Sequence, residues 1–384
     1  MGLSRRQFLM AGAAASLVGA MPRFALAATS ASDTRLVVVL LRGGLDGLHA
    51  LPRPNDSDYL RLRGALGEAA VKDAHPIDDG FALHPALSFA SQLYAAKEFL
   101  PVVAVAPPYR QRSHFEAQDC VENGTQGPGG RNGWMNRCVH ELGGSGGLAI
   151  TAVMPLIMRG DSAATTWSPP LPHAIDPILM QHLQLLYARD AMLGPAFARA
   201  GTDEDDKCEK GGSKRGHLSD ALGAAARFMS AADGPRIAFV EDTGWDTHGN
   251  QAGILQRKLL ELDSGLQAFK ASGDAIWPRT AIVVVTEFGR TAAVNGTNGT
   301  DHGTGGVAFL AGGAVNGGRV AGTWPGLANS QLNERRDLLA TSDMRGLFKG
   351  VLESHLRVAA AASDARVFPA SADVAVMRGL IRAS

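Results

Sequence analysis

Apolar runs bounded by turn residues predict six strands along the chain. Most of these runs are continuous, without the alternation of apolar and polar residues that a half-exposed strand shows. They fall at Arg35–Leu41, Val102–Ala106, Leu148–Met154, Arg236–Glu241, Ala281–Thr286 and Val307–Ala311. Continuous apolar runs are typical of strands that are covered on both faces, as in a parallel sheet flanked by helices.

Helical spacing of apolar residues occurs between these strands. The predicted helices are Pro85–Lys97, His114–Glu122, Pro177–Met192, Leu218–Ala231, Gln251–Ala271 and Ser342–Glu353. The alternation of strands and helices predicts an α/β fold, with a mostly parallel central sheet and helices on both faces.

One segment, residues 202–216, is dense in charge and glycine and has no periodicity. This composition predicts a mobile excursion from the core, although the segment would equally serve to divide two lobes. With no internal repeat in the sequence, the simpler interpretation is a single domain over residues 28–384.

The first thirty residues have the features of an export signal. Arg5 and Arg6 precede Gln7-Phe8-Leu9, and an apolar, alanine-rich stretch follows. Ala25-Leu26-Ala27 supplies the small-x-small pattern that a signal peptidase cleaves. The alternative is a transmembrane anchor, but the stretch falls short of the roughly 20 apolar residues that span a bilayer. We predict a twin-arginine signal peptide over residues 1–27, the twin-arginine translocase as partner during export, and a periplasmic or secreted mature protein without stable membrane insertion.

The charge composition of the chain argues against nucleic acid and anionic membranes as partners. Lys plus Arg equals Asp plus Glu at 37 each, so no global field attracts nucleic acid or an anionic membrane. About 355 residues remain after cleavage, enough for a well-buried core. Three cysteines match no Cys-x-x-Cys metal spacing, and the oxidising compartment permits one disulfide, for which Cys120 and Cys138 are the first choice over Cys208.

Polar clusters follow several predicted strands, and in an open parallel sheet the functional groups collect at the carboxyl ends of the strands. The run Arg42-Gly43-Gly44-Leu45-Asp46-Gly47 places Asp46 in a glycine turn after the first strand. Such a turn is also an ordinary loop, so Asp46 carries a functional role only if other clusters join it.

A second cluster spans Glu241 to Gln251 and contains Asp242, Asp246 and His248. Carboxylate oxygen and imidazole nitrogen together are ligands for divalent metals. The alternative is a helix N-cap, since Asp or Thr before Gln251 would satisfy free amides of the following helix.

A third cluster follows the most apolar strand and contains Glu287, Arg290, Asp301 and His302. It combines oxygen and nitrogen ligands for a metal with an arginine that binds anions in bidentate fashion. The alternative here is turn chemistry in a Gly/Asn/Thr loop.

The run Arg110-Gln111-Arg112-Ser113-His114-Phe115-Glu116 supplies a candidate nucleophile, Ser113, at a predicted helix start. Backbone amides at a helix start favour a phosphate or sulfate group, and Arg112 adds a charge-assisted contact. Ser113 and Glu116 also have the spacing of a capping box, which is a purely structural alternative. We assign no role to the further histidines His49, His84 and His140.

At these motifs the chain resembles the alkaline phosphatase, sulfatase and phosphopentomutase superfamily of metal-dependent ester hydrolases and mutases. The stretches RGGLDGL, RSHFEAQD, GWDTHGNQ and TEFGRT with NGTNGTDHG, between about residues 35 and 320, together with the leader, resemble one exported bacterial family within it that is catalogued as a domain of unknown function. The resemblance implies an alkaline-phosphatase-like three-layer sandwich. It also implies metal ligands among six residues and a nucleophile with two anion-binding arginines. These are Asp46, Asp246, His248, Glu287, Asp301 and His302, with Ser113, Arg112 and Arg290.

The chain departs from the superfamily pattern at two places. Where the superfamily has Asp-His-Gly at a strand end, this chain has Glu287-Phe288-Gly289, and a phenyl ring cannot bind a metal. Asp246 and His248 are two residues apart, whereas the superfamily separates that pair by about one helical turn. Asp242 is therefore an alternative partner of His248. One metal position, built by Asp246, His248 and His302 and completed or oriented by Asp46, Glu287 or Asp301, is the expectation.

These observations lead to two main hypotheses. The first is an exported metal-dependent hydrolase of small-molecule sulfate or phosphate esters, with zinc, manganese or calcium as cofactor. The second is an exported binding or scaffold protein that keeps the fold without turnover, because of Phe288. An accessory subunit of another exported enzyme is a third possibility.

Overall fold

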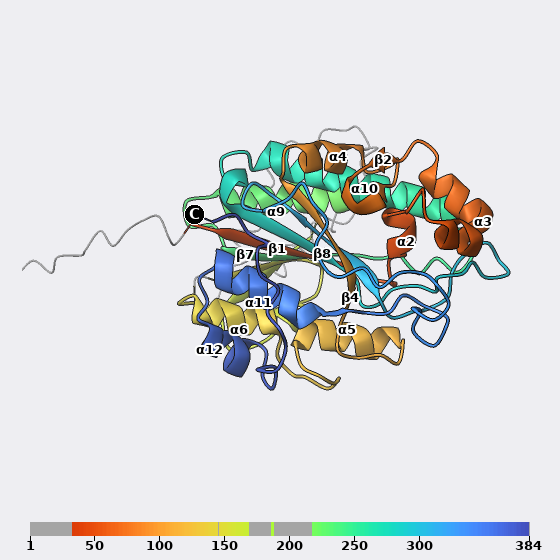
Figure 1. Ribbon diagram of the computed structural model, residues 1–384. Coiled ribbons are helices and arrows are strands. Elements are labelled where there is room, and N and C mark those ends of the chain that lie inside the picture. Colours follow the sequence, from red (N-terminus) through yellow and green to blue (C-terminus); the bar gives the residue numbers. More distant parts are fainter. Residues whose placement is uncertain (1–32, 145, 169–185, 188–216, 384) are drawn as a thin grey trace, which may run out of the picture. The chain divides into compact units, whose positions relative to one another are not determined.

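The computed structural model describes residues 33–144, 146–168, 186–187 and 217–383, and residues Thr34–Ser384 form one compact unit (Figure 1). The predicted signal peptide, the predicted excursion at 202–216, Cys208, and nearly all of the predicted helix Pro177–Met192 lie outside the described residues. Among the described residues, no helix is both long enough and apolar enough to cross a membrane.

An eight-stranded sheet forms the centre of this unit, in the order β10-β4-β9-β8-β1-β7-β5-β6. Its strands are β1 Arg35–Leu41, β4 Phe99–Ala106, β5 Gly147–Ile150, β6 Ala164–Trp167, β7 Ile237–Asp242, β8 Thr280–Val285, β9 Gly306–Ala311 and β10 Ser342–Asp343. All neighbouring strands are parallel except at β9, which runs antiparallel to both β4 and β8. A separate two-stranded ribbon pairs β2 His75–Pro76 with β3 Ala82–Leu83.

Helices cover both faces of the sheet, which confirms the predicted α/β class with a mostly parallel sheet between two helical layers (Figure 1). The helices are α2 Gly47–Ala50, α3 Ser57–Val71, α4 Ser88–Ala95, α5 His114–Asn123, α6 Trp134–Glu141, α9 His217–Ser230, α10 Gln251–Ser272, α11 Met344–His355 and α12 Ala360–Ala362. Figure 1 shows α4, α9 and α10 on one side of the sheet and α5, α6 and α11 on the other.

Strand β1 explains why the apolar runs are continuous. Val37, Val39 and Leu41 pack into the core beneath α4, α9 and α10. Their neighbours Leu36, Val38 and Leu40 pack into the opposite core with α6 and α11. Because both faces of the strand are buried, every residue after Arg35 is apolar.

Several helix boundaries differ from the predicted ones because of specific caps. Helix α4 begins at Ser88, where the buried Asp263 carboxylate accepts hydrogen bonds from the Phe89 and Ala90 amides at 2.8 Å each. Helix α11 begins at Met344, because the two residues before it pair with β4 as strand β10. Asp343 then caps the helix by accepting from the Arg345 amide.

The permitted disulfide between Cys120 and Cys138 is absent, and both residues are buried free thiols. Cys120 lies on α5 and Cys138 on α6, where the latter belongs to the apolar core. Burial raises the pKa of the Cys120 thiol to about 11 and that of Cys138 to about 12. Thiols of this kind are protonated and unreactive at neutral pH.

Candidate metal centre

The loops after β1, β7 and β8 meet at one edge of the sheet, because these strands are parallel neighbours in the order β8-β1-β7. Asp246 and His248 follow β7, and Glu287 and Arg290 follow β8. The antiparallel β9 begins soon after Asp301 and His302, so these residues come to the same edge. Helix α5, which follows β4, adds His114 at its first position.

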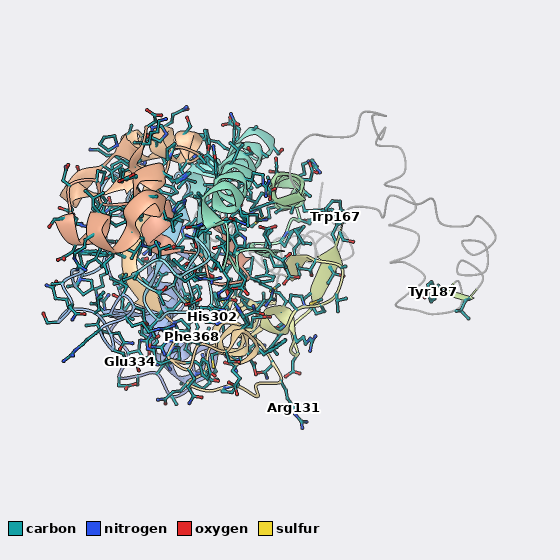
Figure 2. All side chains as sticks on the ribbon, turned by 90° about the vertical axis from the view of Figure 1, so that its right-hand side faces the viewer. Arg131, Trp167, Tyr187, His302, Glu334 and Phe368 are labelled. Atoms are coloured by element: carbon teal, nitrogen blue, oxygen red, sulfur yellow. The ribbon has the colours of Figure 1, made fainter. Side chains whose placement is uncertain are left out.

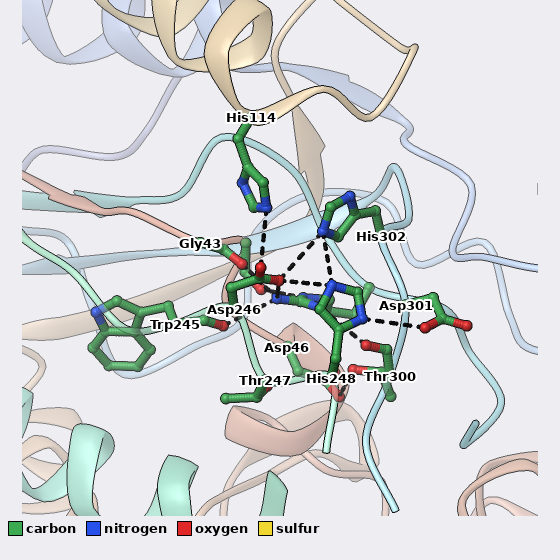
Figure 3. A network of polar contacts seen from close by, with 12 residues as sticks. Gly43, Asp46, His114, Trp245, Asp246, Thr247, His248, Thr300, Asp301 and His302 are labelled. Carbon is green, nitrogen blue, oxygen red and sulfur yellow. Dashed lines mark hydrogen bonds and ion pairs between the residues drawn. The ribbon is translucent and has the colours of Figure 1, made fainter. Parts of the chain in front are cut away.

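Three imidazole rings surround the carboxylate of Asp246 (Figure 3). His248 Nε2 lies 2.9 Å from Asp246 Oδ1, and His302 Nε2 lies 3.2 Å from the same oxygen. The two Nε2 atoms are 3.0 Å apart. His114 Nε2 is 3.4 Å from Asp246 Oδ2 and makes no hydrogen bond.

The opposite nitrogen of each ring is held by an oxygen acceptor. His114 Nδ1 donates to Glu287 Oε1 at 2.8 Å, and His248 Nδ1 donates to Asp301 Oδ1 at 3.2 Å. His302 Nδ1 donates to the backbone carbonyl of Arg112 at 3.1 Å. Because Nδ1 carries the proton in each neutral ring, the three Nε2 lone pairs point toward Asp246.

This arrangement fits a divalent metal ion. Three lone pairs and a carboxylate repel one another unless a cation lies between them, and oxygen-bound Nδ1 atoms are the usual support of metal-binding histidines. In a tetrahedral site, ligand atoms about 2.0–2.1 Å from a zinc ion lie about 3.3–3.4 Å apart. The observed separations of 2.9, 3.0, 3.2 and 3.4 Å are close to this spacing. The ligand atoms of His114, Asp246 and His302 all lie within 4.8 Å of one another. His248 Nε2 is not part of this group of three, but it lies next to Asp246 and His302.

The cluster is open to solvent on one side. The side chains of Asp246 and His248 are 42% and 44% exposed, whereas His114 and His302 are about a quarter exposed. A substrate therefore has access to the face formed by Asp246 and His248.

Local charges set the protonation of these groups. The hydrogen bond from His114 to Glu287 raises the pKa of His114. Burial lowers the pKa of His302, and repulsion from His114 and Arg290 lowers it further. Burial acts to raise the pKa of Asp246, but Arg290 and the neighbouring imidazoles outweigh it and hold this pKa below its usual value. His302 and Asp246 are therefore deprotonated at neutral pH, as metal ligands must be.

Arg290 fastens the loops of the site together. Its guanidinium, almost fully buried, donates to the carbonyls of Gly43, Gly44 and Trp245 and to Asp246 Oδ1. A further bond goes to the Thr300 carbonyl. Arg290 therefore positions Asp246, and the structure does not present its guanidinium to a ligand.

Arg112 contributes its backbone instead of its guanidinium. The carbonyl holds His302, while the guanidinium pairs with Glu334 at 2.6 Å and Asp337 at 3.2 Å. Its φ of 61° lies in the left-handed region, and this conformation occurs directly before Ser113 and His114.

Ser113 is the N-cap residue of α5, but its side chain makes no capping hydrogen bond. Glu116 accepts from the Tyr109 hydroxyl instead of completing a capping box. Ser113 therefore forms no capping box, and its side chain hydrogen-bonds with Tyr109 instead. In the chain it directly precedes His114.

Phe288 forms an apolar wall of the site. Its ring centroid is 4.8 Å from those of His114 and His302, and the side chain is 3% exposed. Phe288 cannot itself bind a metal, but its ring packs against two imidazoles of the candidate metal centre. Gly44 has φ of 73°, and a Cβ there would come within 2.7 Å of the Phe288 ring, so this position requires glycine.

Asp46 is held in a different network. It forms a buried ion pair with Arg63 and accepts from Gln251 Nε2 at 2.6 Å. It also caps α2 by accepting from the Leu48 and His49 amides. Because these groups occupy its carboxylate, the structure does not bring Asp46 to the histidine cluster.

The other candidates also have structural partners. Asp242 pairs with Lys258 at 2.5 Å and accepts from the Trp245 indole, so the structure pairs His248 with Asp246 and Asp301 instead. His49 and His84 are buried, with their ring centroids 5.0 Å apart. His140 is exposed on α6.

His114 is a member of the cluster that the sequence did not predict. The residue lies within the RSHFEAQD stretch, in which Ser113 was the predicted functional residue. The available signal was the presence of a histidine at the first position of a helix that follows a buried strand.

Comparison with solved structures finds similar folds at low identity. A crystal structure titled as Ps i-CgsB in complex with k-i-k-neocarrahexaose is 12% identical, covers 77% of this chain and 69% of its own, and has a TM-score of 0.38. A protein in the alkaline phosphatase superfamily from Vibrio parahaemolyticus is 12% identical, with coverages of 76% and 63% and a TM-score of 0.37. Alkaline phosphatase from the Antarctic bacterium TAB5 is 12% identical, with coverages of 73% and 92% and a TM-score of 0.35. At these TM-scores the likenesses do not decide the function of this chain.

Sequence comparison gives one family and no curated relative. No curated protein matches the chain at a significant level. Residues 181–368, just under half of the chain, match the model of one family and include Asp246, His248 and His302 but not His114. This segment is similar to the family described as "Protein of unknown function (DUF1501)".

Proposed function

We propose that the chain is a metal-dependent hydrolase of phosphate or sulfate esters, with one divalent ion bound by His114, Asp246, His248 and His302. The observation that carries this proposal is the convergence of three Nε2 atoms on the Asp246 carboxylate, with every Nδ1 held by an oxygen. Three nitrogens and one carboxylate oxygen favour zinc over calcium, which prefers oxygen ligands.

A bound divalent ion supplies Lewis acidity toward an ester oxygen and toward a hydroxyl or water. The chain's own residues hold the ligands in place. Glu287 and Asp301 orient two of the rings, and Arg290 fixes Asp246. Phe288 excludes water from one side of the cluster.

Ser113 is the candidate nucleophile within this proposal. Its support is the position directly before His114 and the absence of a side-chain capping bond. Replacement with alanine should abolish turnover while leaving the bound metal in place. Normal turnover in Ser113→Ala would instead point to an attacking water.

The test begins with metal analysis of the purified protein after exchange into zinc, manganese or calcium. Turnover is then measured with 4-nitrophenyl phosphate, bis(4-nitrophenyl) phosphate and 4-nitrophenyl sulfate. His302→Ala should lose both metal and turnover, whereas the control His140→Ala, at an exposed histidine on α6, should keep both. A wild-type protein that binds no metal would overturn the proposal.

A second candidate function is ligand binding at the metal without turnover. The observation that favours it is that the guanidinium groups of both candidate anion-binding residues, Arg112 and Arg290, are already bound to protein groups. Metal binding together with binding of esters but no product across the panel would select this function.

Export is proposed as well, supported by Arg5-Arg6 and the apolar stretch that follows. The twin-arginine route carries folded cargo, so the metal would be loaded before export. Replacement of both arginines by lysine should leave precursor in the cytoplasm. Mature protein that still reaches the periplasm, or a metal-free cytoplasmic precursor, would contradict this part of the proposal.

A further inference from the structure

A pocket of about 240 Å³ lies beside the metal centre, between α3, the loop that follows β8 and the loop around residues 329–336. Arginines from two of these segments line it, namely Arg61, Arg335 and Arg336. Asn295 and Asn329 contribute amide groups, and Asp301 forms part of the wall. The lining therefore offers three cationic side chains and one carboxylate.

The arginines keep donor capacity for a ligand. Among the described residues, Arg61 pairs with Asp58 on its own helix, at an exposed site. Arg336 lies 3.3 Å from Asp337 and also interacts with Asp301 and Glu334. Within the described ranges, Arg335 forms no ion pair or side-chain hydrogen bond. A guanidinium group has five N–H donors, so each of the three arginines can bind an anion oxygen.

Asp301 is the negatively charged residue of the pocket wall, and it interacts with Arg336. Its carboxylate already accepts from His248 Nδ1 and from Asn295 Nδ2. Both of these bonds involve Oδ1, and they hold the side chain against the metal centre. Among the charged residues that line the pocket, three arginines still outnumber the single aspartate.

Backbone hydrogen bonds fix the walls of the pocket. The Val294 amide donates to the Leu62 carbonyl of α3, and the Ala292 amide donates to the Arg336 carbonyl at 2.9 Å. Segments distant in sequence are thereby locked together, so the arginines are presented on a preformed surface.

Asp301 connects the pocket with the metal centre. Figure 3 shows Asp301 on the opposite side of the His248 ring from Asp246. Asp301 therefore lines the pocket and also contacts His248 of the metal centre.

We propose that this pocket binds a second anionic group of the substrate, so that the preferred substrates are esters with at least two phosphate, sulfate or carboxylate groups. This inference rests on the proposed ester hydrolysis for the reaction, but the pocket itself can be tested without turnover.

The test measures binding of inorganic phosphate, inorganic sulfate and acetate, each alone, by calorimetry at low ionic strength. His302→Ala is used as the background, so that the metal centre does not contribute. The double variant Arg61→Gln/Arg335→Gln in this background should bind the preferred anion at least tenfold more weakly. The control Arg131→Gln should bind as the background does, since Arg131 is exposed and lies away from His302 (Figure 2).

The ranking of the three anions identifies the class of the second group. If none of the three anions binds, or if the double variant binds them as well as the background does, the proposed anion site is wrong. Bound metal and turnover in the wild type would in that case still support the proposed ester hydrolysis. Conversely, the double variant alone could lose anion binding while the wild type shows no turnover. This result would support the anion site and contradict the proposed ester hydrolysis.

Discussion

At the scale of single residues, the chain holds two polar networks, a partly exposed one around Asp246 and a buried one around Asp46. The histidines around Asp246 turn their free nitrogens toward a common centre, whereas Asp46 is enclosed by groups that already satisfy it. Both contain an aspartate that follows a parallel strand in a glycine-containing loop. Only the partners of the two carboxylates distinguish a metal ligand from a structural ion pair.

Asp46→Asn should destabilise the protein without removing the metal. Burial acts to raise the pKa of Asp46, but Arg63 outweighs it and lowers this pKa, so the pair stabilises the fold above the unfolded pKa of about 3.9. The contribution is lost as the pH falls through the lower folded pKa. Removing one partner of a buried pair costs about 3–5 kcal/mol.

Urea unfolding measures this effect. At pH 7 the variant should unfold at lower urea than the wild type, and the difference should shrink below about pH 4. A difference in urea unfolding that does not depend on pH would contradict the role of the ion pair. Loss of bound metal in Asp46→Asn would show that Asp46 is a metal ligand after all.

Phe288→Ala should weaken metal binding although the residue is not a ligand. The ring packs against His114 and His302, and its removal leaves both imidazoles free to move. The loss of a buried phenyl ring also costs about 3–5 kcal/mol of stability. Phe288→Leu keeps most of the apolar volume and should retain most of the affinity, measured by competition with a zinc chelator. Equal affinity in Phe288→Ala and the wild type would show that the wall has no role in metal binding.

At the scale of elements, buried carboxylates set where helices begin. Asp263 on α10 accepts the first free amides of α4, so one helix caps another across the upper layer in Figure 1. Burial raises the pKa of Asp263, which means that the charged form carries a desolvation cost at neutral pH.

Asp263→Ala should destabilise the protein by about 1–3 kcal/mol, because two buried amides lose their acceptor. Asp263→Asn should cost less, since its carbonyl still accepts a bond and no charge is buried. The free energies of unfolding of both variants in urea test this ranking. If Asp263→Ala were no less stable than Asp263→Asn, the hydrogen bonds from the Phe89 and Ala90 amides to Asp263 would not contribute to stability.

The long apolar elements could be predicted from the sequence, and the short or polar ones could not. The six predicted strands correspond to β1, β4, β5, β7, β8 and β9, because burial on both faces requires uninterrupted apolar residues. Strand β6 reads Ala-Thr-Thr-Trp at the sheet edge and gives no apolar run. Helix α3 was not predicted, although Asp56 caps its start.

The candidate site could be predicted only in part. Asp246 and His248 follow the parallel strand β7, and His302 lies just before the antiparallel β9, so each lies in a loop next to an apolar strand. His114 comes from the helix after β4, and β4 reaches the site only because the antiparallel β9 separates it from β8. Sequence pattern alone does not reveal that strand order.

At the scale of the whole molecule, metal and fold should be coupled, because the cluster joins loops from β7 and β8 to the start of α5. A ligand that binds only the folded state stabilises it by about 4 kcal/mol at about a thousand times its Kd. Zinc should therefore raise the melting temperature of the wild type but not of His302→Ala.

The size of this thermal shift should depend on pH. Protons compete with the metal for the imidazoles, and the hydrogen bond to Glu287 raises the pKa of His114. The shift should be largest at pH 8 and decline as the pH falls below about 7. A shift that is constant from pH 8 to pH 5 would exclude histidine ligands.

The most direct test of the metal centre is an anomalous difference map, recorded at the zinc edge from crystals grown with zinc. The map should show one strong peak about 2.0–2.2 Å from Asp246 and from the Nε2 atoms of His114, His248 and His302. Crystals of His302→Ala, grown in the same way, should lack this peak. No peak in the wild type, or a peak beside Asp46 instead, would contradict the central claim.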